Sequence, residues 1–401
     1  MDLFFEMKKP VFSKRQICEA PSGNPWAGKM VLNPAMIRDD QDPDTIHMIF
    51  RSTGPCPEAR IEGKPMPYPI FIGYAVSHDA GKNWDFDFSR PLLDLPLSNE
   101  PEGLYTVNMA GEKVFNYANG GTEDPRLMYF ENELYLSLVC RSFPPGPYWD
   151  HDDPLQCIPD WVQESDLNVA VKENYSVTQL YKVSLDALRQ RDYEHALALV
   201  GPLHEPDASD DRDVVLFPRR LEINGRKKIV CIHRPKFPWL YEIGKELTAP
   251  SIFLAAADEL EDFAIPGKAE RIVFAKAEFE WEANRIGASW PPVEIAPGEW
   301  LLPYHGKQDE QVGYTQSFMI LKENGTLKLD IVTRPAERLL YADEPWELEG
   351  EFTIPCLFSC SGIVMDNGEL LMGYGAADKK IGLVSTNYKD LLNYLIDYNK
   401  D

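Results

Sequence analysis

Three features are scarce in this sequence: basic residues, long apolar runs and helical periodicity. The 40 lysines and arginines are outnumbered by 64 acids, which gives a formal net charge of −24. This balance argues against a general affinity for nucleic acid or anionic lipid, because both are negatively charged and bind basic patches. No run approaches the ~20 apolar residues of a membrane span, and MDLFFEMKKPVFSKRQ (1–16) lacks the apolar core of a signal peptide. We therefore expect a cytoplasmic protein with no nucleic-acid or membrane partner.

Cysteine pairs with metal-ligand or redox spacing are also absent. The seven cysteines are an odd number without a C-x-x-C pair, which favours reduced thiols over a disulfide framework. Cys356 and Cys360 could meet across a bend, but buried free thiols are the better interpretation.

Short apolar runs rich in Val, Ile, Phe and Tyr recur along the whole chain, with turn residues between them. Examples are IFIGYAVS (70–77), KKIVCIHRP (227–235) and EWLLPYHG (299–306). This pattern predicts an all-β fold. Helical periodicity is confined mainly to residues 184–200 and 387–398, and the latter predicts a short C-terminal helix.

Several turns have the chemistry of tight hairpins, as in EINGRKKIV (222–230) and MDNGELLMGY (365–374), where Gly after Asn supplies a positive φ. SHDAGKNW (77–84) matches the S-x-D-x-G-x-x-W turn called the Asp box, which recurs in β-propellers. Its role is expected to be structural: Asp79 accepts bonds from backbone amides while Trp84 packs beneath the turn. A calcium-binding or catalytic role is the weaker alternative.

Repeated hairpins over 401 residues indicate a radial array of sheets. Blades of four strands and ~45–80 residues would fit about five times. We therefore predict an all-β, five-bladed β-propeller that forms a single domain over residues 1–401. Residues 143–169 break the strand rhythm and predict a long inserted loop over one face, for which a functional role and a solvated insertion are both open.

The stretch GTEDPR (121–126) sets two carboxylates and an arginine around a proline. Pro125 is expected to push Asp124 into the extended region, and Arg126 can then face the same side. By itself this is a common turn with a local ion pair. Further motifs in a fixed order change that interpretation.

These motifs span essentially the whole chain, and each is weak alone. They are NPAMIRD (33–39), GYAVSHDAG (73–81), GTEDPR, LFPRRLEINGRKKIVCIHRP (216–235), WEANRIGASWPP (281–292), EWLLPYHG, EPWELEG (344–350) and YGAAD (374–378). In this order the chain resembles glycoside hydrolase family 130, the inverting β-mannoside phosphorylases and mannosidases built on a five-bladed propeller. The resemblance implies a glycoside phosphorylase that converts a β-1,4- or β-1,2-linked mannoside to α-mannose 1-phosphate and a shortened acceptor.

The resemblance also implies roles for individual residues. Asp124 would be the general acid, its proton passing through a hydroxyl of the bound mannose, while a nucleophile attacks the opposite ring face. The implied sugar-binding residues are Arg51, Glu123, Arg126, Trp290, Tyr304, His305 and Asp378. The implied phosphate-binding residues are Arg141, Arg220, His233, Arg234 and Tyr314, because guanidinium groups bind phosphate oxygens. Pairing of these arginines with surface acids is the alternative.

No cofactor or metal is implied, and inorganic phosphate is the co-substrate of a manno-oligosaccharide or mannosyl-glucose type substrate. Two other functions stay open: a β-mannosidase with Glu294 or an acid of the 150s as base, and a non-catalytic carbohydrate-binding propeller. Thr248 and Ala249 replace an acid and a serine that are common in the family, so the linkage and the aglycone are left open, as is a homo-oligomeric assembly.

Overall fold

A computed structural model of the chain describes most of the sequence. The described residues are 8–55, 60–61, 64–65, 69–94, 105–141, 176–204, 210–237, 247, 249–309, 311–350 and 354–398. The long loop expected at 143–169 lies outside them. Within these ranges, no helix has both the length and the apolar character needed to cross a membrane.

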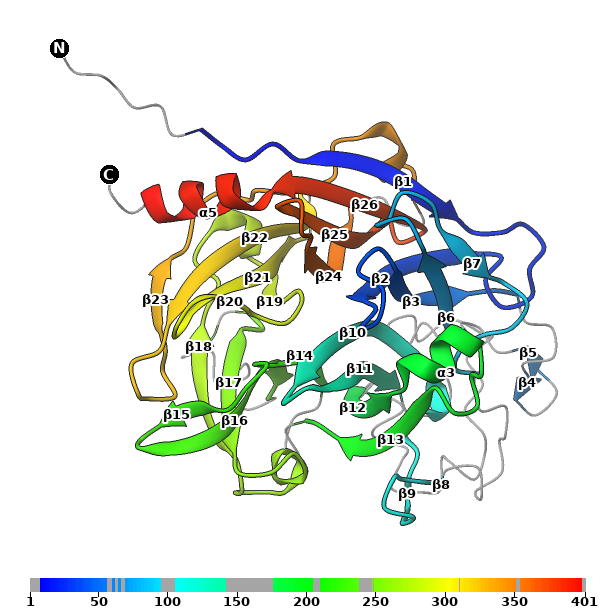
Figure 1. The fold of residues 1–401 in the computed structure, drawn as a ribbon, viewed down its shortest axis with the longest axis horizontal. Coiled ribbons are helices and arrows are strands. Elements are labelled where there is room, and N and C mark those ends of the chain that lie inside the picture. Colours follow the sequence, from blue (N-terminus) through cyan, green and yellow to red (C-terminus); the bar gives the residue numbers. More distant parts are fainter. Residues whose placement is uncertain are drawn as a thin grey trace.

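Strands dominate the structure, as the apolar runs predict, and the all-β class is confirmed. Four larger sheets lie around a common centre (Figure 1). One contains β1 (Ser13–Glu19), β24 (Leu357–Val364), β25 (Glu369–Ala376) and β26 (Lys380–Asn387). The next contains β2 (Met30–Arg38), β3 (Ile46–Thr53), β6 (Ile70–Ser77) and β7 (Asp85–Asp87). A five-stranded sheet contains β19 (Arg285–Ala288), β20 (Val293–Ala296), β21 (Glu299–Gln308), β22 (Gly313–Lys322) and β23 (Asp330–Thr333).

The largest sheet has nine strands and consists of two antiparallel parts. The first part is β10 (Thr122–Phe130), β11 (Glu133–Arg141), β12 (Ser176–Val183) and β13 (Leu197–Pro202). The second is β14 (Asp210–Leu216), β15 (Leu221–Ile223), β16 (Arg226–Lys236), β17 (Ile252–Ala257) and β18 (Glu270–Ala275). A single parallel pair, Ser176 with Asp210, joins the two parts. The pairing therefore weakens between β12 and β14.

The smaller elements lie outside these sheets. Two short hairpins are β4 (Arg60–Ile61) with β5 (Lys64–Pro65) and β8 (Tyr105–Val107) with β9 (Lys113–Phe115). Among the described residues, the α-helices are α3 (Leu185–Gln190) and α5 (Tyr388–Asp397), and the 3₁₀ turns are η2 (Tyr117–Gly120), η3 (Glu261–Ala264), η4 (Glu280–Glu282) and η5 (Pro345–Glu347). The predicted C-terminal helix is confirmed. The helix expected over 184–200 is wrong beyond Gln190, because Arg191 is left-handed (φ 53°) and residues 197–202 form β13.

The first and last described strands lie in one sheet, where β1 pairs antiparallel with β26 (Figure 1). Apolar side chains fill the space between neighbouring sheets. Val215, Ile232, Leu254, Ile286 and Leu302, for example, belong to one buried cluster that joins the second part of the nine-stranded sheet to the five-stranded sheet. Burial of such surface contributes ~25 cal/mol per Å², so the sheets are held to one another by packing as well as by their ladders.

The predicted turn chemistry is present. Asn224 and Gly225 have φ values of 53° and 75° in the β15–β16 hairpin, as a tight turn of this kind requires. In the SHDAGKNW turn, the Asn83 amide donates to Asp79 (2.8 Å) and the Trp84 indole donates to the Gly81 carbonyl (3.0 Å). Cys356 and Cys360 are buried free thiols, as expected.

Candidate active site

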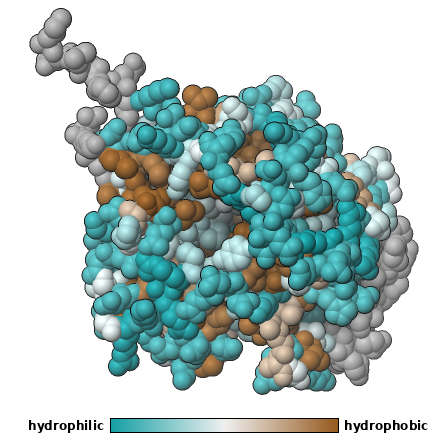
Figure 2. All heavy atoms as spheres, in the orientation of Figure 1, coloured by the Kyte–Doolittle hydropathy of each residue, from teal (hydrophilic) through white to brown (hydrophobic). Residues whose placement is uncertain are grey.

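A 610 Å³ pocket lies where the larger sheets meet. Figure 2 shows the molecule hollowed near the middle of this face, with hydrophilic residues around the hollow. The lining is unusually charged for a cavity. Its charged residues are Arg51, Glu123, Asp124, Arg141, Asp210, Arg212, Asp213, Arg234, Arg285, Lys307 and Asp378, and its other residues are Leu32, Asn33, Tyr314, Ile354, Pro355, Cys356 and Phe358.

Three of these residues interrupt the strands that border the pocket. Asn33 in β2, Asp124 in β10 and Asp213 in β14 have φ values of 49°, 53° and 59°. At each, the pairing with the next strand changes register. Asn and Asp tolerate this left-handed conformation better than most side chains do. The extended conformation expected for Asp124 is therefore wrong: the bulge between Glu123 and Arg126 outweighs the effect of Pro125.

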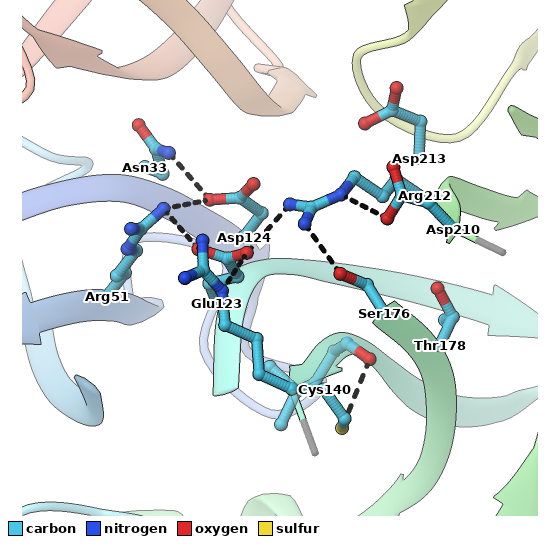
Figure 3. A network of polar contacts seen from close by, with 12 residues as sticks. Asn33, Arg51, Glu123, Asp124, Cys140, Ser176, Thr178, Asp210, Arg212 and Asp213 are labelled. Atoms are coloured by element: carbon cyan, nitrogen blue, oxygen red, sulfur yellow. Dashed lines mark hydrogen bonds and ion pairs between the residues drawn. The ribbon is translucent and has the colours of Figure 1, made fainter. Parts of the chain in front are cut away.

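The Asp124 carboxylate is held at the pocket wall by two donors. The Asn33 side-chain amide donates to its Oδ1 (2.7 Å), and Arg51 Nη1 lies 3.1 Å from the same oxygen (Figure 3). The side chain keeps 13% of its surface exposed, so it remains accessible from the pocket. Both contacts leave Oδ2 without a bond to either donor.

Glu123, the neighbouring acid, points into a cage of guanidinium groups. Arg51 lies 2.8 Å from one oxygen and Arg212 lies 2.7 Å from the other (Figure 3). Arg141 also contacts this second oxygen (3.0 Å). Burial by itself would raise the pKa of Glu123. The three cations outweigh that effect and hold its pKa below the ordinary value, so this acid stays ionised. Arg212 also binds Asp210 (2.7 Å).

Across the pocket, β19, β21 and β22 present a second group of polar side chains. The Arg285 guanidinium lies 3.5 Å from the Tyr314 hydroxyl and bonds Asn284 through Nε (2.6 Å). Among the described residues, Arg285 has no carboxylate partner. Lys307 lies 5.3 Å from the Tyr314 ring centre and pairs with Asp309 (2.7 Å). This group is less neutralised than the cage around Glu123.

Asp378 follows β25 at the same pocket. Burial raises the pKa of its carboxyl, and Cys356 Sγ lies 3.4 Å from Oδ1. Of the predicted site residues, the structure therefore brings Asp124, Arg51, Glu123, Asp378, Arg141, Arg234 and Tyr314 to the pocket.

Arg126 does not line the pocket, contrary to its predicted contact with sugar. Its side chain is 1% exposed and lies beneath the pocket floor. It donates to Asp213 Oδ1 (2.7 Å), to the carbonyl of Asp124 (3.2 Å) and to the carbonyl of Ser289 (3.0 Å). The bulge at Asp124 turns this arginine inward, so it contacts protein rather than ligand.

Three more predicted sugar contacts are also absent from the lining. Trp290, expected to stack on a sugar ring, is 2% exposed in an apolar cluster. Tyr304 is fully buried and donates to Glu282 (3.0 Å). His305 is fully buried, 3.4 Å from Asp213. Tyr304 and Trp290 belong to buried apolar clusters, and His305 packs against the Phe358 ring (4.7 Å between ring centres), so each is covered by protein.

Two predicted phosphate ligands lie elsewhere too. His233 is buried against Asp211 (3.0 Å). Arg220 pairs with Glu131 (3.1 Å) and is not among the pocket residues. Its position follows the end of β14, where the chain has already left the pocket.

The residues that sequence reasoning missed are Asn33, Asp210, Arg212, Asp213, Arg285 and Lys307. A signal was present for two of them. Asn33, Asp124 and Asp213 occur at nearly equal intervals along the chain, and Asn33-Pro34 repeats the pattern of Asp124-Pro125. Arg285 and Lys307 had no such signal, since they meet only through the pairing of β19 with β21. Within the described residues, no group of His, Cys, Asp or Glu has the arrangement of a metal site.

Sequence comparison finds relatives over the C-terminal half of the chain. Residues 208–397 match the family model described as beta-1,4-mannooligosaccharide phosphorylase. A beta-1,4-mannooligosaccharide phosphorylase of Ruminococcus albus is 30% identical over 188 residues, 46% of this chain and 50% of that protein. The chain thus matches half the length of this curated relative.

Similar solved structures cover nearly the whole chain. A beta-1,2-mannobiose phosphorylase from Listeria innocua has a TM-score of 0.57 and 16% identity over 98% of this chain and 95% of that one. Another structure, reported with glycoside hydrolases of the GH130 family that target beta-1,2-mannosidic linkages in Candida mannan, has a TM-score of 0.59 and 12% identity over 97% of each chain. At these identities the likeness shows the fold alone. The chain is thus similar to this phosphorylase family in sequence over residues 208–397 and to GH130 structures in fold over nearly its whole length.

Proposed function

We propose that this chain is an inverting phosphorylase that cleaves a β-mannoside with inorganic phosphate. The products would be α-mannose 1-phosphate and a shortened acceptor, and no cofactor would be needed. The observation that carries this proposal is the distribution of charge in the pocket. Asp124, a carboxylate accessible from the pocket, shares it with a group of cations of which Arg285 has no acidic partner among the described residues.

Asp124 suits the role of general acid. An inverting reaction needs one acid on the side of the leaving group and a nucleophile on the opposite face of the sugar ring. Arg51 and Asn33 fix one oxygen of this carboxylate and leave the other toward the pocket. The acid would donate its proton to the leaving oxygen through a mannose hydroxyl as the glycosidic bond breaks.

The sugar would lie between Asp124 and Asp378. A neutral carboxyl at Asp378, which its raised pKa favours, can donate as well as accept hydrogen bonds to hydroxyl groups. Asn33 Oδ1 is buried without a hydrogen-bond partner. Arg51 contributes a charged donor at the same wall.

Phosphate would bind across the pocket, at Arg285, Lys307 and Tyr314. A phosphate nucleophile requires cations rather than a base, and charge-assisted bonds to an anion contribute ~1.5–3 kcal/mol each. Arg234 borders the same region, but its charge is largely matched by Asp213 (2.5 Å). A phosphate oxygen would attack the anomeric carbon while the bond to the acceptor breaks.

A hydrolase would need a second carboxylate free to activate water. Glu294, one candidate for this base, pairs with Arg219 (2.5 Å) and does not line the pocket. Within the pocket, Glu123 is surrounded by cations, Asp210 pairs with Arg212 (2.7 Å), and Asp213 pairs with Arg126 and Arg234. Asp378, whose pKa is raised by burial, is the carboxyl assigned above to the sugar. The described part of the pocket therefore supports phosphorolysis better than hydrolysis.

We also propose that the chain acts as a single catalytic β-propeller of five blades. If the nine-stranded sheet is divided at its single parallel pair, the larger sheets give five groups around the pocket. A β-1,4 linkage is the first substrate to test, because the relative with the higher sequence identity is a beta-1,4-mannooligosaccharide phosphorylase.

The test is cleavage of β-1,4- and β-1,2-mannobiose with and without phosphate, followed by proton NMR of the anomeric region. We expect phosphate-dependent formation of α-mannose 1-phosphate, and synthesis of a β-mannoside from that product and an acceptor sugar. Free mannose formed at the same rate without phosphate would show a hydrolase. Cleavage of neither substrate, under either condition, would favour a binding protein.

Variants test the two sides of the pocket. Asp124→Asn should lower turnover ~10²–10⁴-fold, the usual contribution of acid catalysis, while a variant that keeps half of the rate would remove this assignment. Arg285→Gln and Lys307→Gln should raise the KM for phosphate about tenfold or more, and the KM for the mannoside much less. Arg220→Gln is the matched control, since this arginine pairs with Glu131 outside the pocket.

A further inference from the structure

Arg126 links several strands beneath the pocket. Its guanidinium joins β10 to β14 through Asp213 (2.7 Å) and to the segment after β19 through the Ser289 carbonyl (3.0 Å). Its third contact, from Nη1, is the carbonyl of Asp124 itself (3.2 Å). It also lies 5.8 Å from the ring centre of Phe358 in β24. One buried cation thus touches the backbone of the proposed acid and three other strands or strand ends.

This contact matters because the backbone of Asp124 is not in a relaxed conformation. A left-handed φ of 53° at a non-glycine residue costs free energy and persists only where the surroundings hold it. Arg126 donates a hydrogen bond to the carbonyl of this strained residue. Its side chain points to Asn33 and Arg51, on the pocket side. The orientation of the carboxylate is therefore fixed both by Arg126, through the backbone, and by Asn33 and Arg51, through the side chain.

We infer that Asp213, acting through Arg126, is a positioning residue for the acid Asp124. Its Oδ1 receives the Arg126 guanidinium (2.7 Å) and its Oδ2 receives Arg234 (2.5 Å). Asp213 is 1% exposed and, like Asp124, lies at a left-handed bulge. It does not need to touch substrate for this role. The inference rests on the proposed function, because it takes Asp124 to be the acid.

Removing the charge of Asp213 should leave both Arg126 and Arg234 without the carboxylate that pairs with them, and Arg126 would keep only its bonds to main-chain carbonyls. The guanidinium can then move, and the Asp124 carbonyl loses a donor whose position was fixed. A displaced acid should slow cleavage most for substrates whose leaving oxygen must be protonated. Cleavage of a mannoside whose leaving group departs as a stable anion should suffer much less.

The experiment compares two substrates: mannobiose, whose leaving sugar needs a proton, and 2,4-dinitrophenyl β-mannoside, whose phenolate does not. Asp124→Asn provides the reference. We expect Asp213→Asn to lower kcat/KM for mannobiose ~30-fold or more, part of the 10²–10⁴-fold of acid catalysis, and to lower that for the aryl mannoside less than about threefold. Equal losses on both substrates would overturn the inference and leave Asp213 as a structural residue.

A second variant keeps Asp213 and moves it. A Cβ at Gly287 would lie 2.1 Å from Asp213 Oδ2, so Gly287→Ala must displace this carboxylate. We expect the same selective loss on mannobiose. Gly73→Ala is the matched control, since its Cβ would meet the ring of Phe50 in the core (2.4 Å) and no pocket residue. In that control, a general disturbance of packing should lower kcat/KM equally for both substrates.

The outcomes separate this inference from the proposed function. If Asp124→Asn is selective for mannobiose but Asp213→Asn and Gly287→Ala are not, the acid assignment stands and the positioning role is wrong. If Asp124→Asn lowers kcat/KM equally for both substrates, the acid assignment is wrong and the inference is wrong with it. Thermal melting of each variant, with rates taken per folded enzyme, keeps incomplete folding out of the comparison.

Discussion

Replacement of Glu123 by Gln tests the cage of cations beside the proposed acid. Glu123 is 1% exposed and is contacted by three guanidinium groups at 2.7–3.0 Å. Removing one partner of a buried ion pair costs ~3–5 kcal/mol, because the remaining charge is left uncompensated. We expect the lower end, about 3 kcal/mol, since Arg51 keeps Asp124 and Arg212 keeps Asp210. Chemical denaturation at pH 7 measures the change.

The pH dependence of the free energy of unfolding gives a second, independent measure of the contribution of Glu123. The pKa of Glu123 is lowered in the folded protein, whereas an unfolded Glu titrates near ~4.3. Its contribution is therefore present above the unfolded pKa and is lost as pH falls toward the folded one. The stability difference between the wild type and Glu123→Gln should shrink by ~1.7 kcal/mol between pH 5 and pH 3. Glu222→Gln, at an exposed position, is the control substitution.

Phosphate should partly reverse the loss. Without Glu123 the pocket gains one positive charge, so an anion should bind more tightly and stabilise the folded state by mass action. We expect phosphate to raise the melting temperature of Glu123→Gln more than that of the wild type. A loss below about 1 kcal/mol at pH 7, or a difference that grows in acid, would refute the idea that three arginines depend on this carboxylate.

Two further substitutions test side chains around the pocket. Tyr304→Phe should cost about 1–2 kcal/mol of stability, because the buried Glu282 loses a donor, and should leave the KM for the mannoside unchanged. A large rise in that KM at unchanged stability would instead restore Tyr304 as a sugar contact. Gly375→Ala would place a Cβ 2.0 Å from Asn33 Oδ1, so Asn33 must shift away from Asp124. We expect kcat to fall about tenfold or more, as part of the contribution of acid catalysis; full activity in a folded variant would show that the Asn33 contact is dispensable.

Local patterns in the sequence determined the fold class and pointed to the proposed acid. Alternating and continuous apolar runs predict strands because each strand must bury at least one face, and nearly every predicted run is a strand. Asn224-Gly225 predicts its turn because positive φ is a local requirement. GTEDPR pointed to Asp124 because a family motif preserves the order of residues along a chain.

The membership of the pocket depended on the tertiary structure. Whether a strand residue faces the pocket or the core changes with every one-residue shift of register, and the bulges at Asn33, Asp124 and Asp213 introduce such shifts. This is why Arg126 turned to the floor while Asp213 joined the pocket. Arg285 and Lys307 are 22 positions apart, and only the antiparallel pairing of their strands sets them opposite each other. The sequence by itself could name the residue types that the chemistry needs; ladder register, which depends on packing across distant strands, decided which of them share a cavity.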